Sequence, residues 1–405
     1  MIIFKIAFRN IFRQKRRSIL TALTMFGGFT LAAISIGWSD GTYSTIINLF
    51  TRNQLGHIQI HKQDYREQPS IYKTIDDYKQ VEEKLSGIEG VETWTPRLFS
   101  AGIVSVRENS NGARIIGIDP EQENIATRFN KKLIKGDPFS KKPSHETILG
   151  KGLAKVLEAG IGDSAVVVSQ AADGSIANDL YTIIGIIESG DQMTDRMSFY
   201  LHIDDAQELF VLQGRIHEIA VIARELDQVD ALTGKIADRL DNPQLEVASW
   251  KEFAKSFYHA MQADVQGMWI MLFVIILIVA VGVLNTVLMS VLERRKEYGV
   301  LRAIGTKPRQ IITLVLWEVS ILALISVVIG IGLSSIINSS LSDQGFPLPE
   351  SFTYGGVEFA KMYSEVSARS LYIPTITVII TALLVSFFPA LKAAHSEPAK
   401  EMRTH

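Results

Sequence analysis

The chain has 405 residues, a net charge of −2, 47% hydrophobic residues and a mean hydropathy of +0.17. This composition is too apolar for an average soluble enzyme and too charged for a protein made only of membrane helices, so we expect both kinds of segment. Because the sequence contains no cysteine, disulfide bonds and thiolate metal sites are excluded.

The chain begins with a basic, amphipathic segment. Residues 2–12 are mostly Ile and Phe interleaved with Lys5 and Arg9, a pattern typical of a helix that lies in the membrane interface. We therefore predict an amphipathic helix on the cytoplasmic side within residues 1–17.

Four apolar stretches are long enough to cross about 30 Å of hydrocarbon, which takes about 20 helical residues. We predict transmembrane helices at 18–40, 265–292, 311–341 and 370–392. The first stretch could instead be a cleaved signal peptide. Its apolar run is too long for one and Gly37-Trp38-Ser39-Asp40 is not a typical cleavage site, so we expect it to remain as a membrane helix.

Lysine and arginine in the short flanking segments predict the orientation. Residues 1–17 and 293–310 each carry six of these bases, whereas residues 343–369 carry two against four acids. We therefore place the N-terminus, residues 293–310 and the tail at 393–405 in the cytoplasm. Residues 41–264 and 342–369 lie outside.

Residues 41–264 have the pattern of a mixed α/β domain. Apolar alternation and helical periodicity predict its elements. We expect strands at 55–61, 91–107, 113–118, 165–169, 181–187, 199–203, 218–223 and 245–250, and helices at 76–85 and 228–240. Two β-α-β units near the ends would form a porter-like subdomain, with a β-rich subdomain inserted at about 134–205. Residues 41–54 and 251–264 could continue the membrane helices as a helical stalk.

Several site types are not supported. His57 and His61 have metal-ligand spacing only on a helix; on the predicted strand they lie about 13 Å apart. The sequence has no G-x-x-x-x-G-K-[ST] loop, so it lacks that type of nucleotide site. No catalytic set can be argued from spacing, and we expect no enzymatic activity, bound cofactor or nucleic-acid partner.

Residues 293–305 form the most informative segment. Their spacing predicts a helix with Tyr298, Leu301 and Ile304, together with Val300, on an apolar side, and Gly305 is a suitable C-terminal stop. A cytoplasmic segment that only anchors the orientation of the chain would explain the lysines and arginines. It would not explain a short apolar side between two membrane helices, which needs lipid or another protein to cover it. Lipid and a protein partner both remain open.

This segment closely resembles the cytoplasmic loop of FtsX/MacB/LolC-type permeases, the type VII ABC transporter superfamily. The family pattern, E-R-x-x-E-x-G-x-x-[RK]-A-x-G, is matched by Glu293, Arg294, Glu297, Gly299, Arg302, Ala303 and Gly305. The C-terminal end is also similar, in the run 388–394 and at Pro398 and Arg403. With its one-span, large-domain, three-span layout, the resemblance covers essentially the whole chain.

The resemblance implies a permease subunit in the cell inner membrane with a periplasmic domain. Residues 293–305 would be the coupling helix, seated in a groove of a separate dimeric ATPase that binds ATP and Mg²⁺. The residues expected at this contact are Glu293, Arg294, Arg295, Glu297, Tyr298, Gly299, Leu301, Arg302, Ile304 and Gly305. A second permease copy or a paralogue would complete the transporter, and ATP-driven movement would pass to the periplasmic domains by mechanotransmission.

Small residues and one acid mark the membrane helices. Gly27 and Gly28, and Gly330 and Gly332, permit close helix contact either within the chain or with a second permease. Glu318 is an isolated intramembrane acid, which is a default functional candidate. We favour a structural role, in which it reaches the headgroup region or meets an arginine.

In layout the chain is most similar to the lipoprotein-releasing LolC/LolE group, which implies extraction of lipoproteins or lipids from the membrane. In that group a hook on a hairpin recruits a periplasmic carrier. The matching connection, Gln170–Leu180, is shorter than such a hook and has no proline. Alternatives are an FtsX-like regulator of periplasmic hydrolases and an exporter of a peptide or small molecule.

Overall fold

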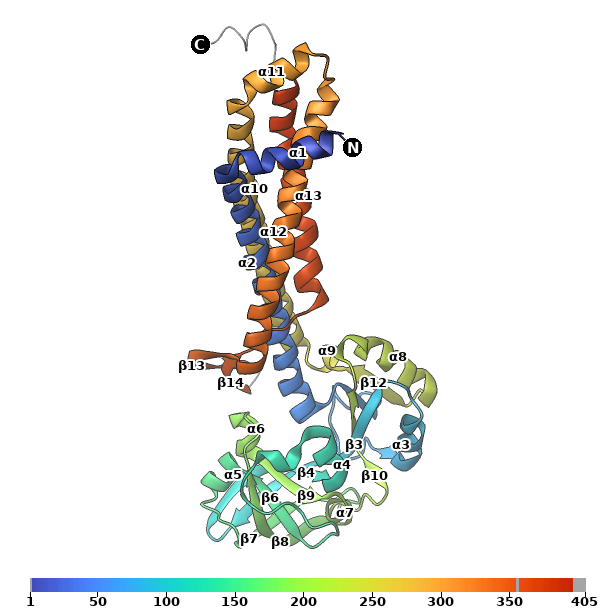
Figure 1. Ribbon diagram of the computed structural model, residues 1–405. Helices are drawn as coiled ribbons and strands as arrows, with labels where there is room; N and C mark the ends of the chain where they lie inside the picture. The colour runs from blue at the N-terminus through green and yellow to red at the C-terminus, as the bar shows by residue number, and fades with distance from the viewer. Residues whose placement is uncertain (1, 355–356, 396–405) are drawn as a thin grey trace. The chain divides into compact units, whose positions relative to one another are not determined.

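The computed structural model describes residues 2–354 and 357–395. Pro398 and Arg403, which contribute to the C-terminal resemblance, lie outside the described residues. The chain divides into two compact units, which are described separately (Figure 1). The helical unit comprises Met1–Tyr43, Met261–Leu348 and Lys361–His405, and the β-rich unit comprises Ser44–Ala260 and Pro349–Ala360.

Within the described residues, four helices are long and apolar enough to cross a membrane. They are α2 (Lys15–Ile47), α10 (Lys255–Glu293), α12 (Pro308–Gln344) and α13 (Ala368–Ala394). Each contains one predicted span and extends beyond it. The extension is expected because flanking polar residues make the same i to i−4 backbone hydrogen bonds as the apolar ones.

Helix α1 (Ile2–Arg13) is separate from α2 and amphipathic. Phe4, Phe8 and Phe12 are exposed on it at a spacing of four, whereas Ala7 is fully buried against the other helices. Phe4 also makes an edge contact with Trp317 of α12, with 5.2 Å between ring centroids. An exposed aromatic stripe beside basic residues is the arrangement expected of an interfacial helix.

The predicted small-residue contacts divide into two kinds. A side chain at Gly28 would collide with Val279 of α10, and one at Gly330 of α12 would collide with Phe29 of α2. These two glycines therefore pack helices of the same chain. A Cβ at Gly27 or Gly332 would meet no atom within 4 Å. Intrachain packing thus explains one glycine of each pair and leaves the other open.

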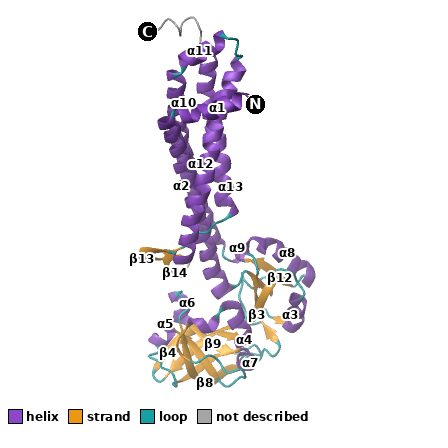
Figure 2. Ribbon diagram, in the orientation of Figure 1, coloured by secondary structure: helices purple, strands orange, loops and turns teal. Residues whose placement is uncertain are grey.

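Ten strands within the described residues form the main sheet of the β-rich unit, seen in orange in Figure 2. In chain order they are β1 (Ile58–Lys62), β3 (Val91–Val106), β4 (Asn109–Ile118), β5 (Leu133–Gly136), β6 (Glu146–Gly150), β7 (Ser164–Gln170), β8 (Ile176–Ile187), β9 (Ser198–His202), β11 (Glu218–Ala223) and β12 (Leu245–Ser249). Short pairs also form between β2 (Ile75–Asp76) and β10 (Arg215–Ile216), and between β13 (Phe346–Tyr354) and β14 (Val357–Met362).

The two predicted β-α-β units combine into one substructure. Strand β11 pairs antiparallel with both β1 and β3, and β12 pairs antiparallel with β1, giving the order β12-β1-β11-β3. With helices α3 (Tyr78–Ser86) and α8 (Val229–Leu240), this is a β-α-β-β-α-β arrangement. Strand β3 continues into pairing with β4 and β7. Strand pairing therefore does not separate an insert at 134–205, and the two-subdomain division stays a prediction.

Shorter helices connect the strands. They are α4 (Pro120–Thr127), the 3₁₀ turn η2 (Phe129–Lys132), α5 (Lys151–Val156), α6 (Gln192–Met197) and α7 (Ile203–Leu209). Strand β8 begins at Ile176, five residues earlier than predicted, so β7 and β8 are joined by residues 171–175. The adjacent polar residues Asn178 and Asp179 hid the strand, because they interrupt the apolar alternation at the point where Ala177 is buried and Leu180 is exposed.

The two segments beside the membrane helices are helical but not continuous. After α2, residues Asn48–Leu55 form a π-helix, η1. On the other side, α9 (Trp250–Phe253) is separated from α10 by Ala254, whose φ of −113° and ψ of 44° interrupt the helix. The stalk prediction overlooked both irregularities because helical periodicity does not distinguish a regular helix from a π turn or a one-residue break.

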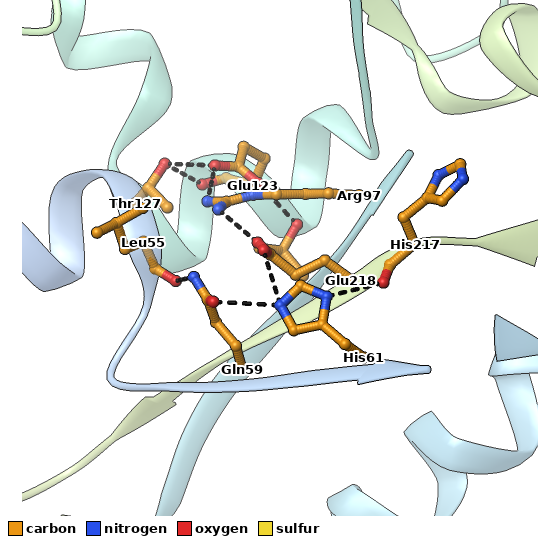
Figure 3. A network of polar contacts seen from close by, with 9 residues as sticks. Leu55, Gln59, His61, Arg97, Glu123, Thr127, His217 and Glu218 are labelled. Atoms are coloured by element: carbon orange, nitrogen blue, oxygen red, sulfur yellow. Dashed lines mark hydrogen bonds and ion pairs between the residues drawn. The ribbon is translucent and has the colours of Figure 1, made fainter. Parts of the chain in front are cut away.

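A buried ionic network lies inside the β-rich unit (Figure 3). Arg97 binds Glu123 through two hydrogen bonds of 2.7 and 3.0 Å and donates a third, of 3.0 Å, to Glu218. Thr95 and Thr127 each donate to Glu123 at 2.9 Å. All three charged side chains are less than 10% exposed. The guanidinium is satisfied by two carboxylates, as burial of charge requires.

The histidines considered for metal binding are part of the core. His61 lies in β1, with Nδ1 3.0 Å from the His217 carbonyl oxygen, and His57 accepts a hydrogen bond from Ala223 N–H at Nδ1. His217 accepts from Phe99 N–H and contacts the Ile71 carbonyl. Among the described residues, no three His, Asp or Glu side chains could hold a metal ion.

We expect the β-rich unit to lose stability as the pH falls from 6.5 to about 4. Burial lowers the pKa of His57 and of His217 to about 4 and lowers that of His61. In this window the unfolded chain binds protons that the folded chain does not, so the free energy of unfolding decreases by up to about 1.4 kcal/mol per pH unit per histidine. Urea unfolding followed by tryptophan fluorescence, after Trp38, Trp269 and Trp317 are replaced by Phe, measures this. A flat profile from pH 6.5 to 4 would contradict it.

Candidate functional site

The segment 293–305 is a short helix that follows a one-residue break. Glu293 ends α10, Arg294 has φ −95° and ψ 13°, and helix α11 spans Arg295–Ala303. The helix is therefore shorter than the predicted range. Gly305 has φ +100°, in the left-handed region that favours glycine, and its N–H donates to the Arg302 carbonyl. Helix α12 then begins at Pro308.

Arg294 fixes the start of this helix. Its side chain is 6% exposed and donates to both carboxylate oxygens of Glu318 in α12, at 2.9 and 3.1 Å. It also donates to Glu297 of α11 at 3.0 Å, and its guanidinium carbon lies 5.2 Å from the centre of the Tyr298 ring. Glu318 is thus paired with an arginine, the structural role favoured from the sequence.

Helix α1 joins the same junction. Asn10 donates to Glu318 at 2.7 Å, and Arg13 forms an ion pair with Glu297. The Arg13 and Glu297 side chains are 57% and 44% exposed, so this pair contributes at most about 1 kcal/mol. The buried Arg294–Glu318 pair is the energetically important one, because removing one partner leaves a buried charge uncompensated.

A small cavity with a mixed polar and apolar lining lies beside the pair. It has a volume of about 40 Å³ and is lined by residues of α1, α2, α10, α11 and α12, among them Arg17 and Ser290, and by Gln14 between α1 and α2. A water molecule needs about 10–15 Å³ of such space, so the cavity holds only a few. It is therefore too small for a substrate.

The two sides of α11 differ from the predicted arrangement. Tyr298 is 1% exposed and packs among the apolar side chains of the helical unit, and burial raises the pKa of its phenol. Leu301 is half-buried, whereas Val300 and Ile304 are 51% and 74% exposed. The structure divides the apolar side predicted for Tyr298, Leu301, Ile304 and Val300, since part of it is covered by the chain itself. Tyr298 faces the chain's own core, and the exposed apolar side chains are Val300 and Ile304.

We call the exposed residues Lys296, Val300 and Ile304 the α11 outer stripe; they recur every four residues. Of these, the predicted contact set contained only Ile304. The other members of that set lie around the helix: Glu297 exposed, Arg295 and Arg302 half-buried, and Gly299 buried. A spacing of four was visible in the sequence, but it could not show which side the other helices cover.

Comparison with known families agrees with this architecture. A family model described as MacB-like periplasmic core domain matches residues 18–239, which is more than half of the chain. The chain belongs to the FtsX/MacB-type ABC transporter permeases. A second model, FtsX-like permease C-terminal, matches residues 269–398 and so includes α11, α12 and α13. The suspected family is confirmed: this is a membrane permease with a periplasmic domain.

Individual relatives are distant. The chain is 22% identical over 310 residues to the lipoprotein-releasing system transmembrane protein LolC of Neisseria meningitidis serogroup B, covering 75% of this chain and 74% of that protein. It is 22% identical to the macrolide export ATP-binding/permease protein MacB of Pasteurella multocida, covering 53% and 32%. The crystal structure of the periplasmic region of MacB from Actinobacillus actinomycetemcomitans matches with a TM-score of 0.39 and 14% identity, covering 52% of this chain and 95% of that one.

Proposed function

We propose that this permease couples ATP hydrolysis by a separate ATPase subunit to substrate movement on the outer side of the inner membrane. The α11 outer stripe is the contact for the ATPase. The observation that carries this proposal is the combination of an exposed apolar pair, Val300 and Ile304, with a buried anchor, Arg294, in one short segment formed by α11 and the residues that flank it. Apolar side chains exposed in a short stripe fit the groove of a partner.

The anchor determines how movement at α11 would be transmitted. Arg294 connects α11 to Glu318 of α12, and Asn10 connects α1 to the same carboxylate. A displacement of α11 by ATPase closure would therefore move α1 and α12 together. ATP and Mg²⁺ bind in the ATPase subunit, with α1, α11 and the C-terminal tail on the cytoplasmic side. A second permease copy or a paralogue completes the transporter.

We infer that the substrate is a lipoprotein or lipid extracted from the membrane. Support comes from LolC, whose name describes a lipoprotein-releasing system and which aligns with three quarters of this chain. The β7–β8 connection offers no long hook for a periplasmic carrier, since only residues 171–175 join the strands. Release would then depend on the permease and its ATPase, with any carrier recruited elsewhere.

Replacing Val300 and Ile304 together by aspartate is expected to abolish association with the ATPase. The two carboxylates would be placed at the apolar part of the contact, where each desolvated charge costs several kcal/mol, equivalent to more than a hundredfold loss of affinity. Co-purification of the ATPase with the detergent-solubilised permease measures the effect.

The matched control is Ile125→Asp in α4, where an equally exposed isoleucine lies in the β-rich unit. It should leave co-purification unchanged. If the double variant still retains the ATPase, or if the control loses it equally, α11 is not the docking helix.

A separate assay in proteoliposomes tests the substrate: ATP should release a lipoprotein from the membrane, and transport of a peptide or small molecule instead would favour the exporter alternative.

A further inference from the structure

A second cavity, distinct from the junction at α11, lies inside the β-rich unit and has a volume of about 100 Å³. Strand pairing builds its wall, because Phe99 of β3 lies opposite Ile116 of β4, and Ile116 lies opposite Tyr200 of β9. Phe129 of η2 covers this face and contacts Tyr200 edge to face, with 5.0 Å between ring centroids. The cavity is therefore bounded by regular strands and aromatic rings.

The size of the cavity limits what it can hold. A cavity needs about 10–15 Å³ of this volume to hold one water, so this cavity has room for several water molecules. That is more than the one or two waters that satisfy isolated buried polar groups. It is smaller than the roughly 300–1,000 Å³ of sites for drug-sized ligands. It therefore fits a small organic molecule or the end of a longer one.

The charges around the cavity are unequal. Three bases, Arg97, Arg114 and Lys132, and two acids, Glu123 and Glu218, line it, which gives a net charge of +1 with all five ionised. Arg97 is already bound to both acids. Burial lowers the pKa of Lys132 to about 8, so its amine is still mostly protonated at neutral pH.

Arg114 is the base whose charge is least compensated. It is exposed, and its guanidinium carbon lies 4.2 Å from the centroid of the Phe99 ring. Within the part of the chain that the structure describes, it has no ion pair with a carboxylate. The ring face attracts the guanidinium, whose planar N–H donors suit a carboxylate.

We propose that this cavity binds an alkyl carboxylate, with the anionic group on Arg114 and Lys132 and the chain against Ile116, Phe129 and Ile187. A single negative charge balances the excess of +1, whereas a doubly charged phosphate would bring uncompensated charge close to Glu123 and Glu218. The apolar part of the wall accounts for the alkyl chain. This site is independent of ATPase docking at α11.

The test is a titration of the full-length permease in nanodiscs with hexanoate, followed by the methyl NMR signals of its isoleucines. Signals of Ile116, Ile118 and Ile187 should shift saturably, while that of Ile236, a buried residue of α8 that does not line the cavity, should not. Along the series butanoate, pentanoate, hexanoate, affinity should rise roughly fourfold per added methylene until the chain reaches the cavity end. Hexanoate should also bind at least tenfold more tightly than hexanol, which lacks the charge.

Arg114→Gln should weaken hexanoate binding by about ten- to a hundredfold, the loss expected for hydrogen bonds to a charged group. Arg107→Gln is the matched control, because Arg107 is an exposed arginine of the same unit that pairs with Asp163. The proposal is overturned if millimolar hexanoate leaves the three signals unchanged, if hexanol binds equally well, or if the two arginine variants behave alike. Longer carboxylates that bind with the affinity of hexanoate would indicate that only the end of a fatty acid enters.

Discussion

Replacement of Arg294 by methionine is expected to destabilise the helical unit by about 3–5 kcal/mol, because it leaves the buried carboxylate of Glu318 without its counter-charge. Glu318 is 15% exposed, and Asn10 would be its one remaining hydrogen-bond donor among the described contacts. The start of α11 would lose its anchor at the same time. Thermal unfolding of the purified permease should show a lower melting temperature, and stimulation of the ATPase should fall.

A double substitution distinguishes the effect of the uncompensated charge on Glu318 from the effect of losing the packing of the Arg294 side chain. In the double variant Arg294→Met with Glu318→Gln, neither buried charge remains, so most of the lost stability should return. Lys296→Met on the same helix is the control, because Lys296 is exposed and its replacement should leave the free energy of unfolding within about 0.5 kcal/mol of the parent. If the double variant is as unstable as Arg294→Met alone, the pair is not what holds α11.

Replacement of Arg97 by methionine should have a comparable effect on the β-rich unit, again about 3–5 kcal/mol. Two carboxylates, Glu123 and Glu218, would then be buried next to each other with no guanidinium between them. Arg97 now holds the pKa of Glu123 below its usual range against the opposing effect of burial. Its loss should therefore make Glu123 take up a proton on folding. Urea unfolding at several pH values, followed by Trp94 and Trp250 fluorescence, measures both effects.

The compensating variant is Arg97→Met with Glu123→Gln and Glu218→Gln, which removes all three charges and should recover part of the stability. Arg107→Met, on the exposed pair with Asp163, should cost at most about 1 kcal/mol. An Arg97→Met variant as stable as this control would mean that the two carboxylates are solvated and that the network has little energetic importance.

The sequence by itself determined the elements whose signal is local. Apolar runs bounded by charges located the four long helices, since crossing hydrocarbon requires uninterrupted apolar length. Local patterns located β3, β11 and β12 to within a residue or two. Alternation predicts a strand with one buried face, and a short apolar run such as that of β11 is consistent with a strand buried on both faces. The family followed from a motif of adjacent residues, 293–305, which also needs no tertiary information.

Only the tertiary structure decided which of these residues meet. Arg294 and Glu318 are separated by 24 positions and Asn10 and Glu318 by 308, and no periodicity relates residues on different helices. The same is true of Arg97, 121 positions from Glu218. Spacing showed that α11 has an apolar side, but whether Tyr298 or Ile304 faces outward depends on where α1, α12 and α13 pack. Distant contacts are set by the packing of whole elements, which is why the anchor of α11 and its outer stripe became visible only in the fold.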